Sequence, residues 1–242
     1  MIRLFCFSLF LATAGFAATP LRIAIIGDST VCNYPTNSAC RGWGQFIEDY
    51  FSKGTVHVDN LAKGGRSTKT FIKEGLWQRT LNEKPDIILI QFGHNDSHGH
   101  GKPEATDAAT DFQDNLRRYI DEARAINAMP ILVTPMYRRT FDKAGKLTDI
   151  LGPYAAAMKT VAAEKKVPVI DLHTSSGKLF EPLGDAGCMV FASAPTDRTH
   201  FNEKGARAMA ELVMQELPAV APPLQARLRE AANKSGAGSR AF

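Results

Sequence analysis

Five short apolar runs, rich in Ile and Val, recur along the chain and limit the folds that it can adopt. The first run ends at Gly27, as expected for a buried strand of a parallel sheet. A strand covered on both faces reads as a continuous apolar stretch rather than as an alternating pattern. We therefore predict five buried strands, at residues 21–26, 56–59, 86–91, 131–134 and 167–171.

Helical patterns lie between these runs, with apolar residues repeating on one face. They predict helices near residues 46–51, 112–126, 154–164 and 203–217. Regular alternation of strands and helices is typical of a doubly wound α/β fold. We expect a flavodoxin-like sandwich in which helices flank a five-stranded parallel sheet.

The length of 242 residues suits one core, and we expect a single domain at residues 19–220. Pro218, Pro222 and Pro223 are expected to end the last helix. Residues 221–242 form a tail; within it residues 224–232 are compatible with a short helix, and we expect the final ten residues to be disordered.

The first 18 residues have the features of a secretory signal peptide. Arg3 precedes an apolar run at residues 4–16, and small residues follow it, so cleavage is expected after Ala17 or Ala18. The run is shorter than the roughly 20 residues needed to span a bilayer. We expect a secreted or periplasmic protein without stable membrane insertion.

The composition argues for a packed core and against nucleic acid as a partner. Hydrophobic residues make up 44% of the chain and charged residues 22%. The formal net charge is +4, and the basic residues are scattered, whereas a nucleic-acid footprint is clustered. We expect a monomer.

Cysteine usage leaves the pairing open. Loss of Cys6 with the signal peptide leaves Cys32, Cys40 and Cys188, an odd number. Cys32 and Cys40 flank a short loop, and an oxidising compartment makes their disulfide plausible.

Three chemically useful residues follow three of the predicted strands. Ser29 follows the first strand, Gly65 the second and Asn95 the third. Because ligands of open α/β sheets bind beyond the carboxyl ends of the strands, we expect these residues to face one crevice.

The pair Asp197 and His200 completes a candidate catalytic set. His200 can take the proton of the Ser29 hydroxyl, and Asp197, three residues earlier, can hold the imidazole in the required tautomer. The Ser29 amide, the Gly65 amide and the Asn95 side chain can donate to an oxyanion. The set predicts ester hydrolysis.

These residues resemble the four sequence blocks of the SGNH (GDSL-type) hydrolase superfamily: Gly27-Asp28-Ser29, Gly65, Asn95 and Asp197-x-x-His200. Within it the sequences around Arg41-Gly42-Trp43-Gly44, Gly64-Gly65-Arg66-Ser67 and Gly93-His94-Asn95-Asp96 are similar to those of rhamnogalacturonan acetylesterases. Thr30 replaces the Leu of the GDSL name. The resemblance implies a hydrolase domain at residues 19–220 that removes acetyl groups from pectin or a related plant polysaccharide and requires no cofactor or metal.

Residues near this set have side chains that suit other roles. His94, Asp96, His98 and His100 have ligand chemistry for a transition metal, but the glycines between them favour a flexible polar loop. Trp43 and Tyr137 are aromatic and predicted to lie near the active end, so that, like His94, each is a candidate for sugar binding; packing is the alternative.

Two other functions use the same fold. A lipid-type esterase or thioesterase would share the catalytic set but require an apolar acyl groove. A non-catalytic carbohydrate-binding protein would retain affinity for polysaccharide without releasing acetate.

Overall fold

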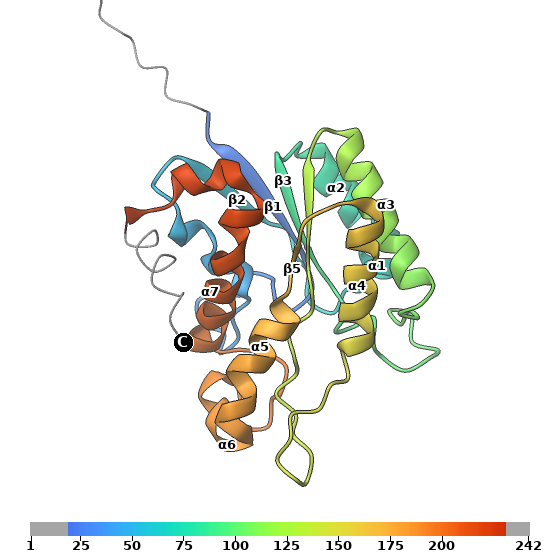
Figure 1. Cartoon of the computed structure of the whole chain (residues 1–242), viewed down its shortest axis with the longest axis vertical. Helices are drawn as coiled ribbons and strands as arrows, with labels where there is room; N and C mark the ends of the chain where they lie inside the picture. Colours follow the sequence, from blue (N-terminus) through green and yellow to red (C-terminus); the bar gives the residue numbers. More distant parts are fainter. Residues whose placement is uncertain (1–18, 231–242) are drawn as a thin grey trace, which may run out of the picture.

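One five-stranded sheet organises the chain (Figure 1). The structure is a computed structural model that describes residues 19–230, so the predicted signal peptide and the predicted disordered end of the tail lie outside it. The order across the sheet is β2-β1-β3-β4-β5 and every pairing is parallel, which confirms the predicted α/β fold class. The strands are β1 (Leu21–Gly27), β2 (Val56–Asn60), β3 (Ile87–Gln91), β4 (Met129–Val133) and β5 (Val169–Ile170).

Alternate side chains of the central strands pack into two separate cores. Ile23 and Ile25 of β1 face one core, whereas Ala24 and Ile26 face the other, and all four are fully buried. Both faces of the sheet are therefore covered, which explains why its central strands read as continuous apolar runs. Strand β5, at the edge of the sheet, is much shorter than predicted.

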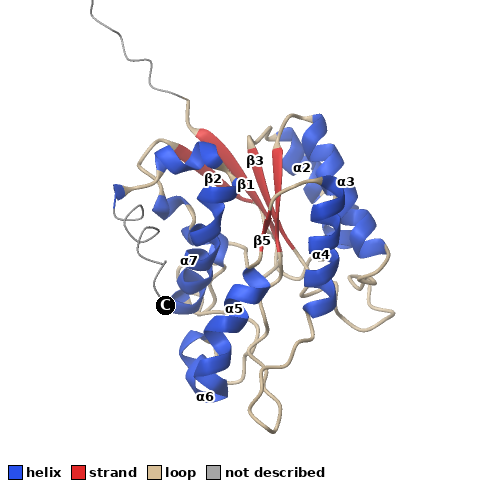
Figure 2. Cartoon of the chain, in the orientation of Figure 1, coloured by secondary structure: helices blue, strands red, loops and turns tan. Residues whose placement is uncertain are grey.

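Helices cover the two faces of the sheet (Figure 2). The first core is shared with α5 (Leu172–Phe180), α6 (Gly184–Cys188) and α7 (Glu203–Val220). The second core lies under α1 (Thr68–Lys73), α2 (Leu76–Asn82), α3 (Asp111–Ala125) and α4 (Gly152–Lys165). The sheet is thus the middle layer of a three-layer sandwich.

Several predicted helices differ from those in the structure. Residues 46–51 do not form one helix: Phe46 ends the 3₁₀ turn η1 (Trp43–Phe46), and a second 3₁₀ turn, η2 (Glu48–Tyr50), follows. The helices α1, α2, α5 and α6 were not predicted, because each is too short for a clear apolar period. No helix within residues 19–230 is long and apolar enough to cross a membrane.

The last helix does not end at Pro218, contrary to the prediction. Helix α7 continues through Pro218 to Val220, and Pro218 is buried. A proline in the last turn removes only one intrahelical hydrogen bond, and apolar burial can offset that loss. The 3₁₀ turn η5 (Pro222–Arg227) follows and includes the first part of the short helix considered for residues 224–232, of which residues 231–232 lie outside the described residues.

The three cysteines within the described residues are free thiols, so the plausible disulfide between Cys32 and Cys40 is not formed. Cys32 and Cys188 are buried, whereas Cys40 is partly exposed. Each buried thiol lies within 4.0 Å of a backbone carbonyl oxygen, that of Ser29 for Cys32 and that of Phe180 for Cys188.

Candidate active site

The candidate catalytic residues gather at the carboxyl end of the sheet. Strand β1 lies between β2 and β3, so the loops that follow these three strands emerge next to one another. The Lys63 amide donates to the carbonyl of Gly27 at 2.9 Å, which holds the loop after β2 beside the end of β1. This is the topological switch point at which open α/β sheets bind their ligands.

Ser29, His200 and Asp197 form one chain of hydrogen bonds. The Nε2 atom of His200 lies 2.9 Å from the Ser29 hydroxyl oxygen, and Nδ1 lies 2.9 Å from Oδ2 of Asp197. Since a carboxylate accepts but cannot donate, Nδ1 carries a proton and Nε2 is left to accept one. The imidazole is therefore in the tautomer that can deprotonate Ser29.

Asp197 is held as a carboxylate by a complete set of donors. Its Oδ1 atom accepts from the amides of Thr199 and His200, each at 2.8 Å, and Oδ2 also accepts from the Ser193 hydroxyl at 2.9 Å. Partial burial acts to raise the pKa of Asp197, but the hydrogen bonds from His200, Thr199 and Ser193 outweigh it and lower the pKa to about 2. The carboxylate stays charged throughout the range in which an imidazole can act as a base.

His200 lies just before helix α7, and the start of that helix is fixed. The Asn202 side chain caps α7 by accepting from the Gly205 amide at 3.0 Å. On the other side of the chain, the Phe201 carbonyl accepts from the Arg41 amide at 2.8 Å. These contacts limit the movement of the segment that carries the base.

Asn95 is oriented by the loop that follows β2. Its Nδ2 atom donates to the carbonyl of Arg66 at 2.9 Å, and only 8% of the residue is exposed. The amide group has a second hydrogen, which is available to a developing oxyanion. The loop contains Gly65 at φ +78°, a left-handed conformation that favours glycine.

A buried carboxylate lies beneath Asn95. Asp96 is fully buried and accepts from the amide and hydroxyl of Thr68, from the Thr106 hydroxyl and from the Gly93 amide. Burial outweighs these hydrogen bonds and raises the pKa of Asp96 to about 7. Asp96 thereby ties the Asn95 loop to the start of α1, a structural role that the sequence analysis did not identify.

Two of the three candidate sugar contacts have buried side chains, which favours packing over contact with a sugar. Trp43 is fully buried, and its indole N–H donates to Oε1 of Gln91 at 2.8 Å. His94 is 2% exposed, with Nδ1 3.4 Å from Oδ2 of Asp28. Tyr137 is partly exposed and stacks on His173 with ring centroids 4.1 Å apart, so its contact with sugar stays a prediction.

The histidine-rich loop does not assemble a metal site. His94 and Asp96 are buried with the partners described above, and His98 pairs through Nδ1 with Oε1 of Glu104 at 2.7 Å. Among residues 19–230, no group of three or more His, Cys, Asp or Glu side chains is arranged to hold a metal ion.

An open hollow lies beside Gly65, one of the candidate oxyanion donors. Its volume is about 400 Å³, and Gly65 forms part of its wall. The charged side chains in the wall are Arg66, Lys73, Glu74 and Glu104. These four charged side chains can hydrogen-bond to a polar ligand.

The fold and the site together define a class of ester hydrolases, and comparison with known protein families identifies the same class. Residues 25–208 match the GDSL-like lipase/acylhydrolase family, and the chain belongs to this family. It is accordingly a carboxylic ester hydrolase, and the resemblance drawn from the sequence is confirmed.

Individual relatives show which ester hydrolases the chain is similar to. The chain is 38% identical over 224 residues to the rhamnogalacturonan acetylesterase RhgT of Bacillus subtilis (strain 168), a match covering 86% of this chain and 94% of the relative. It is 25% identical over 213 residues to a rhamnogalacturonan acetylesterase of Emericella nidulans, covering 80% and 83%. The crystal structure of the Bacillus subtilis protein YxiM superposes with a TM-score of 0.73 at 32% identity, over 83% of this chain and 57% of that longer chain.

Proposed function

We propose that the protein is a serine carbohydrate esterase that removes O-acetyl groups from a plant cell-wall polysaccharide, with rhamnogalacturonan as the favoured substrate. The observation that carries the reaction is the hydrogen-bonded chain from Ser29 through His200 to Asp197. The choice of rhamnogalacturonan as the substrate is based on the similarity to rhamnogalacturonan acetylesterases of Bacillus subtilis and Emericella nidulans.

The reaction proceeds in two steps through an acyl-enzyme. The Ser29 hydroxyl oxygen attacks the acetyl carbonyl carbon while its proton passes to Nε2 of His200. The Ser29 and Gly65 amides and Nδ2 of Asn95 donate to the resulting oxyanion. When the intermediate collapses, the bond to the sugar oxygen breaks and His200 protonates that oxygen.

Water completes the cycle. His200 takes a proton from a water molecule, whose oxygen attacks the acetyl group on Ser29; the collapse that follows releases acetate and returns the proton to Ser29. Because Nε2 must be unprotonated to begin either step, the rate falls on acidification. None of these steps involves a cofactor.

The charged side chains around the hollow beside Gly65 support a carbohydrate as the substrate. The wall of the hollow contains Arg66, Lys73 and two glutamates, and hydroxyl-rich sugars can hydrogen-bond to such groups. A lipid-type esterase or thioesterase needs an apolar groove for its acyl chain instead.

The proposal includes export of the protein to the periplasm or the medium. This part is based on the first 18 residues of the sequence, which have the features of a signal peptide.

Acetate release tests the proposal directly. The protein is incubated with acetylated rhamnogalacturonan, acetylated xylan and p-nitrophenyl acetate, and Ser29→Ala serves as the blank. Preferential release from rhamnogalacturonan, lost in the variant, is the expected result. Full activity of Ser29→Ala would overturn the mechanism, and activity confined to p-nitrophenyl acetate would overturn the substrate.

A further inference from the structure

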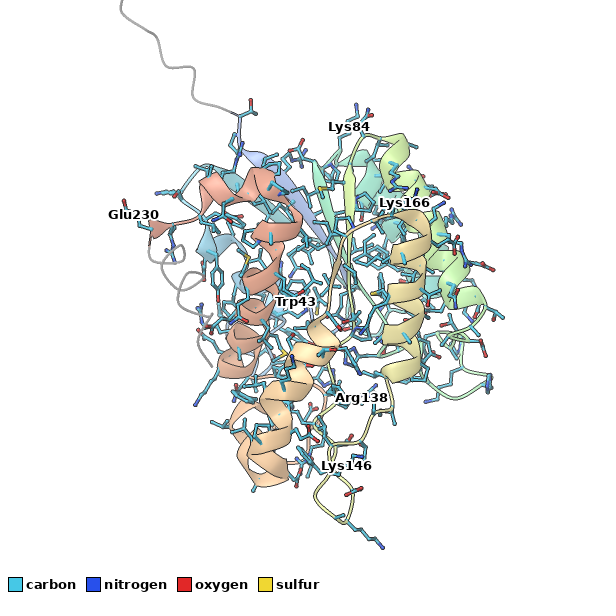
Figure 3. All side chains as sticks on the ribbon, viewed as in Figure 1. Trp43, Lys84, Arg138, Lys146, Lys166 and Glu230 are labelled. Carbon is cyan, nitrogen blue, oxygen red and sulfur yellow. The ribbon has the colours of Figure 1, made fainter. Side chains whose placement is uncertain are left out.

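Two consecutive arginines follow β4 and turn toward the segment that carries the candidate base. In Figure 3, Arg138 lies at the carboxyl end of the sheet, whereas Lys84 and Lys166 mark the opposite end. Arg138 is partly buried and Arg139 is fully buried. Within the described part of the chain, neither arginine forms an ion pair with a carboxylate. Groups other than carboxylates therefore compensate the charge of each guanidinium.

Arg139 is surrounded by backbone carbonyls of the segment from Asp197 to His200. Its Nη2 atom donates to the carbonyls of Asp197, at 3.1 Å, and His200, at 2.8 Å. Its backbone amide donates to the carbonyl of Arg198 at 2.8 Å, and its guanidinium lies 4.3 Å from the centroid of the Phe201 ring. One buried side chain therefore fixes both ends of the Asp-x-x-His segment.

The burial of Arg139 makes these contacts costly to lose. Burial lowers the pKa of Arg139 to about 10, and its Nε atom has no hydrogen-bond partner. A buried cation is tolerated only where polar groups compensate for the lost water. If the segment moved away, Arg139 would lose most of the acceptors that compensate its charge.

Arg138 joins the two sides of the candidate catalytic centre. Its Nη1 atom donates to the Thr199 hydroxyl, and its Nη2 atom donates to the His94 carbonyl at 2.9 Å. Thr199 precedes His200 and His94 precedes Asn95, so one guanidinium connects the segment of the base to the segment of the oxyanion donor. A planar fork with fixed donors suits this task better than an ammonium group.

We propose that Arg138 and Arg139 are positioning residues for ester hydrolysis: Arg139 holds the backbone around His200, and Arg138 sets the separation between His200 and Asn95. The inference rests on the proposed roles of Ser29, His200 and Asn95. A displacement of about 1 Å in such a centre can lower a rate roughly 100-fold, which makes two fixed forks significant.

Variants at Arg138 separate geometry from charge. Arg138→Met removes the fork, and Arg138→Lys keeps the charge without the fork. Arg124→Met is the matched control, because Arg124 also donates through Nη2 to two backbone carbonyls, those of Lys165 and Lys166, and lies at the far end of α3. The measured quantities are kcat and KM for p-nitrophenyl acetate, with circular dichroism to verify folding.

The expected result is a fall in kcat of about 10- to 100-fold in both Arg138 variants, with KM within about twofold and the control unchanged. In an Arg138→Ala protein, millimolar guanidinium is expected to restore part of kcat, which a purely structural defect would not allow. Arg139→Met and Arg139→Lys are expected to lower kcat in the same way where circular dichroism shows a folded protein.

Three outcomes would overturn the inference. A kcat close to that of the unaltered protein in Arg138→Met shows that the fork is dispensable. A kcat in Arg138→Lys equal to that of the unaltered protein shows that the charge alone is needed. If Ser29→Ala is as active as the unaltered protein, the proposed mechanism is wrong and the positioning role is wrong with it. This result is distinct from the first two because it needs no arginine variant.

Discussion

The side-chain amide of Asn95 donates to the carbonyl of Arg66 at 2.9 Å, which joins the loop after β3 to the loop after β2. The contact uses one hydrogen of the Nδ2 group and fixes the direction of the other. Asn95 is thereby oriented before any substrate binds, and an oriented donor requires little reorganisation during the reaction.

Asn95→Ala is expected to lower kcat by about 10²- to 10³-fold with little change in KM, because the donor acts on charge that develops only in the transition state. Steady-state kinetics on p-nitrophenyl acetate checks this. A rise in KM at constant kcat would instead assign Asn95 to ground-state binding.

Asp197→Asn is expected to reduce kcat by roughly 10³- to 10⁴-fold while the fold is retained. The new amide would donate to Nδ1 of His200, which would move the ring proton to Nε2 and prevent that atom from accepting the Ser29 proton. Ser193→Ala, which removes one donor to Asp197, is the milder companion. Comparable losses in the two variants would contradict the tautomer argument.

Asp197 also predicts how stability depends on pH. Its folded pKa of about 2 lies below the usual 3.8, so the stabilisation is present above about pH 4 and is lost as the pH falls toward 2. Since 24% of the side chain is exposed, solvent screening reduces the effect to about 1 kcal/mol. Urea denaturation of the unaltered protein and of Asp197→Asn should give free energies of unfolding whose difference shrinks below pH 4.

Trp43→Phe is expected to destabilise the fold by about 2 to 4 kcal/mol and to leave KM for polysaccharide unchanged. The smaller ring leaves space in the core, and Oε1 of Gln91 loses its closest donor. Chemical denaturation and acetate release measure the two effects. Tyr137→Ala is the comparison variant, because Tyr137 is a partly exposed aromatic residue. A KM for polysaccharide that is raised in Trp43→Phe alone would restore a sugar-binding role for Trp43.

The free thiols predict a graded reaction with iodoacetamide. Burial raises the pKa of Cys32 and of Cys188, which lowers the thiolate fraction of each, whereas Cys40 is partly exposed. Peptide mapping without reductant should find Cys40 modified first in the native protein and all three residues modified after unfolding. A peptide in which Cys32 is linked to Cys40 would contradict the structure.

The central strands could be predicted from the sequence because burial on both faces leaves little choice of residue type. Ile25 and Ile90, for example, are fully buried members of the continuous apolar runs that form β1 and β3. The position of Ser29 and Asn95 at one edge of the sheet could also be predicted, since parallel strands bring their carboxyl ends to one edge. His200 follows no strand, and its membership of the set was predicted from its chemistry and its spacing from Asp197.

Burial of individual polar and aromatic residues could not be predicted in the same way. Trp43 has the residue type of a sugar-stacking side chain, and its burial depends on the distant partner Gln91. Arg139 resembles an exposed loop residue in the sequence, and the carbonyls around its guanidinium belong to residues 58 to 61 positions further along the chain. Local patterns contain no information on such contacts.

The hydrogen bond between Ser29 and His200 joins positions 171 residues apart in the chain. Its formation therefore depends on every strand and crossover helix between them having reached its place. Contacts of such long range form late, because the entropy of closing so large a loop must first be overcome. During refolding, esterase activity should accordingly return after helical structure does, and the rate of acetate release reports the completion of the whole domain.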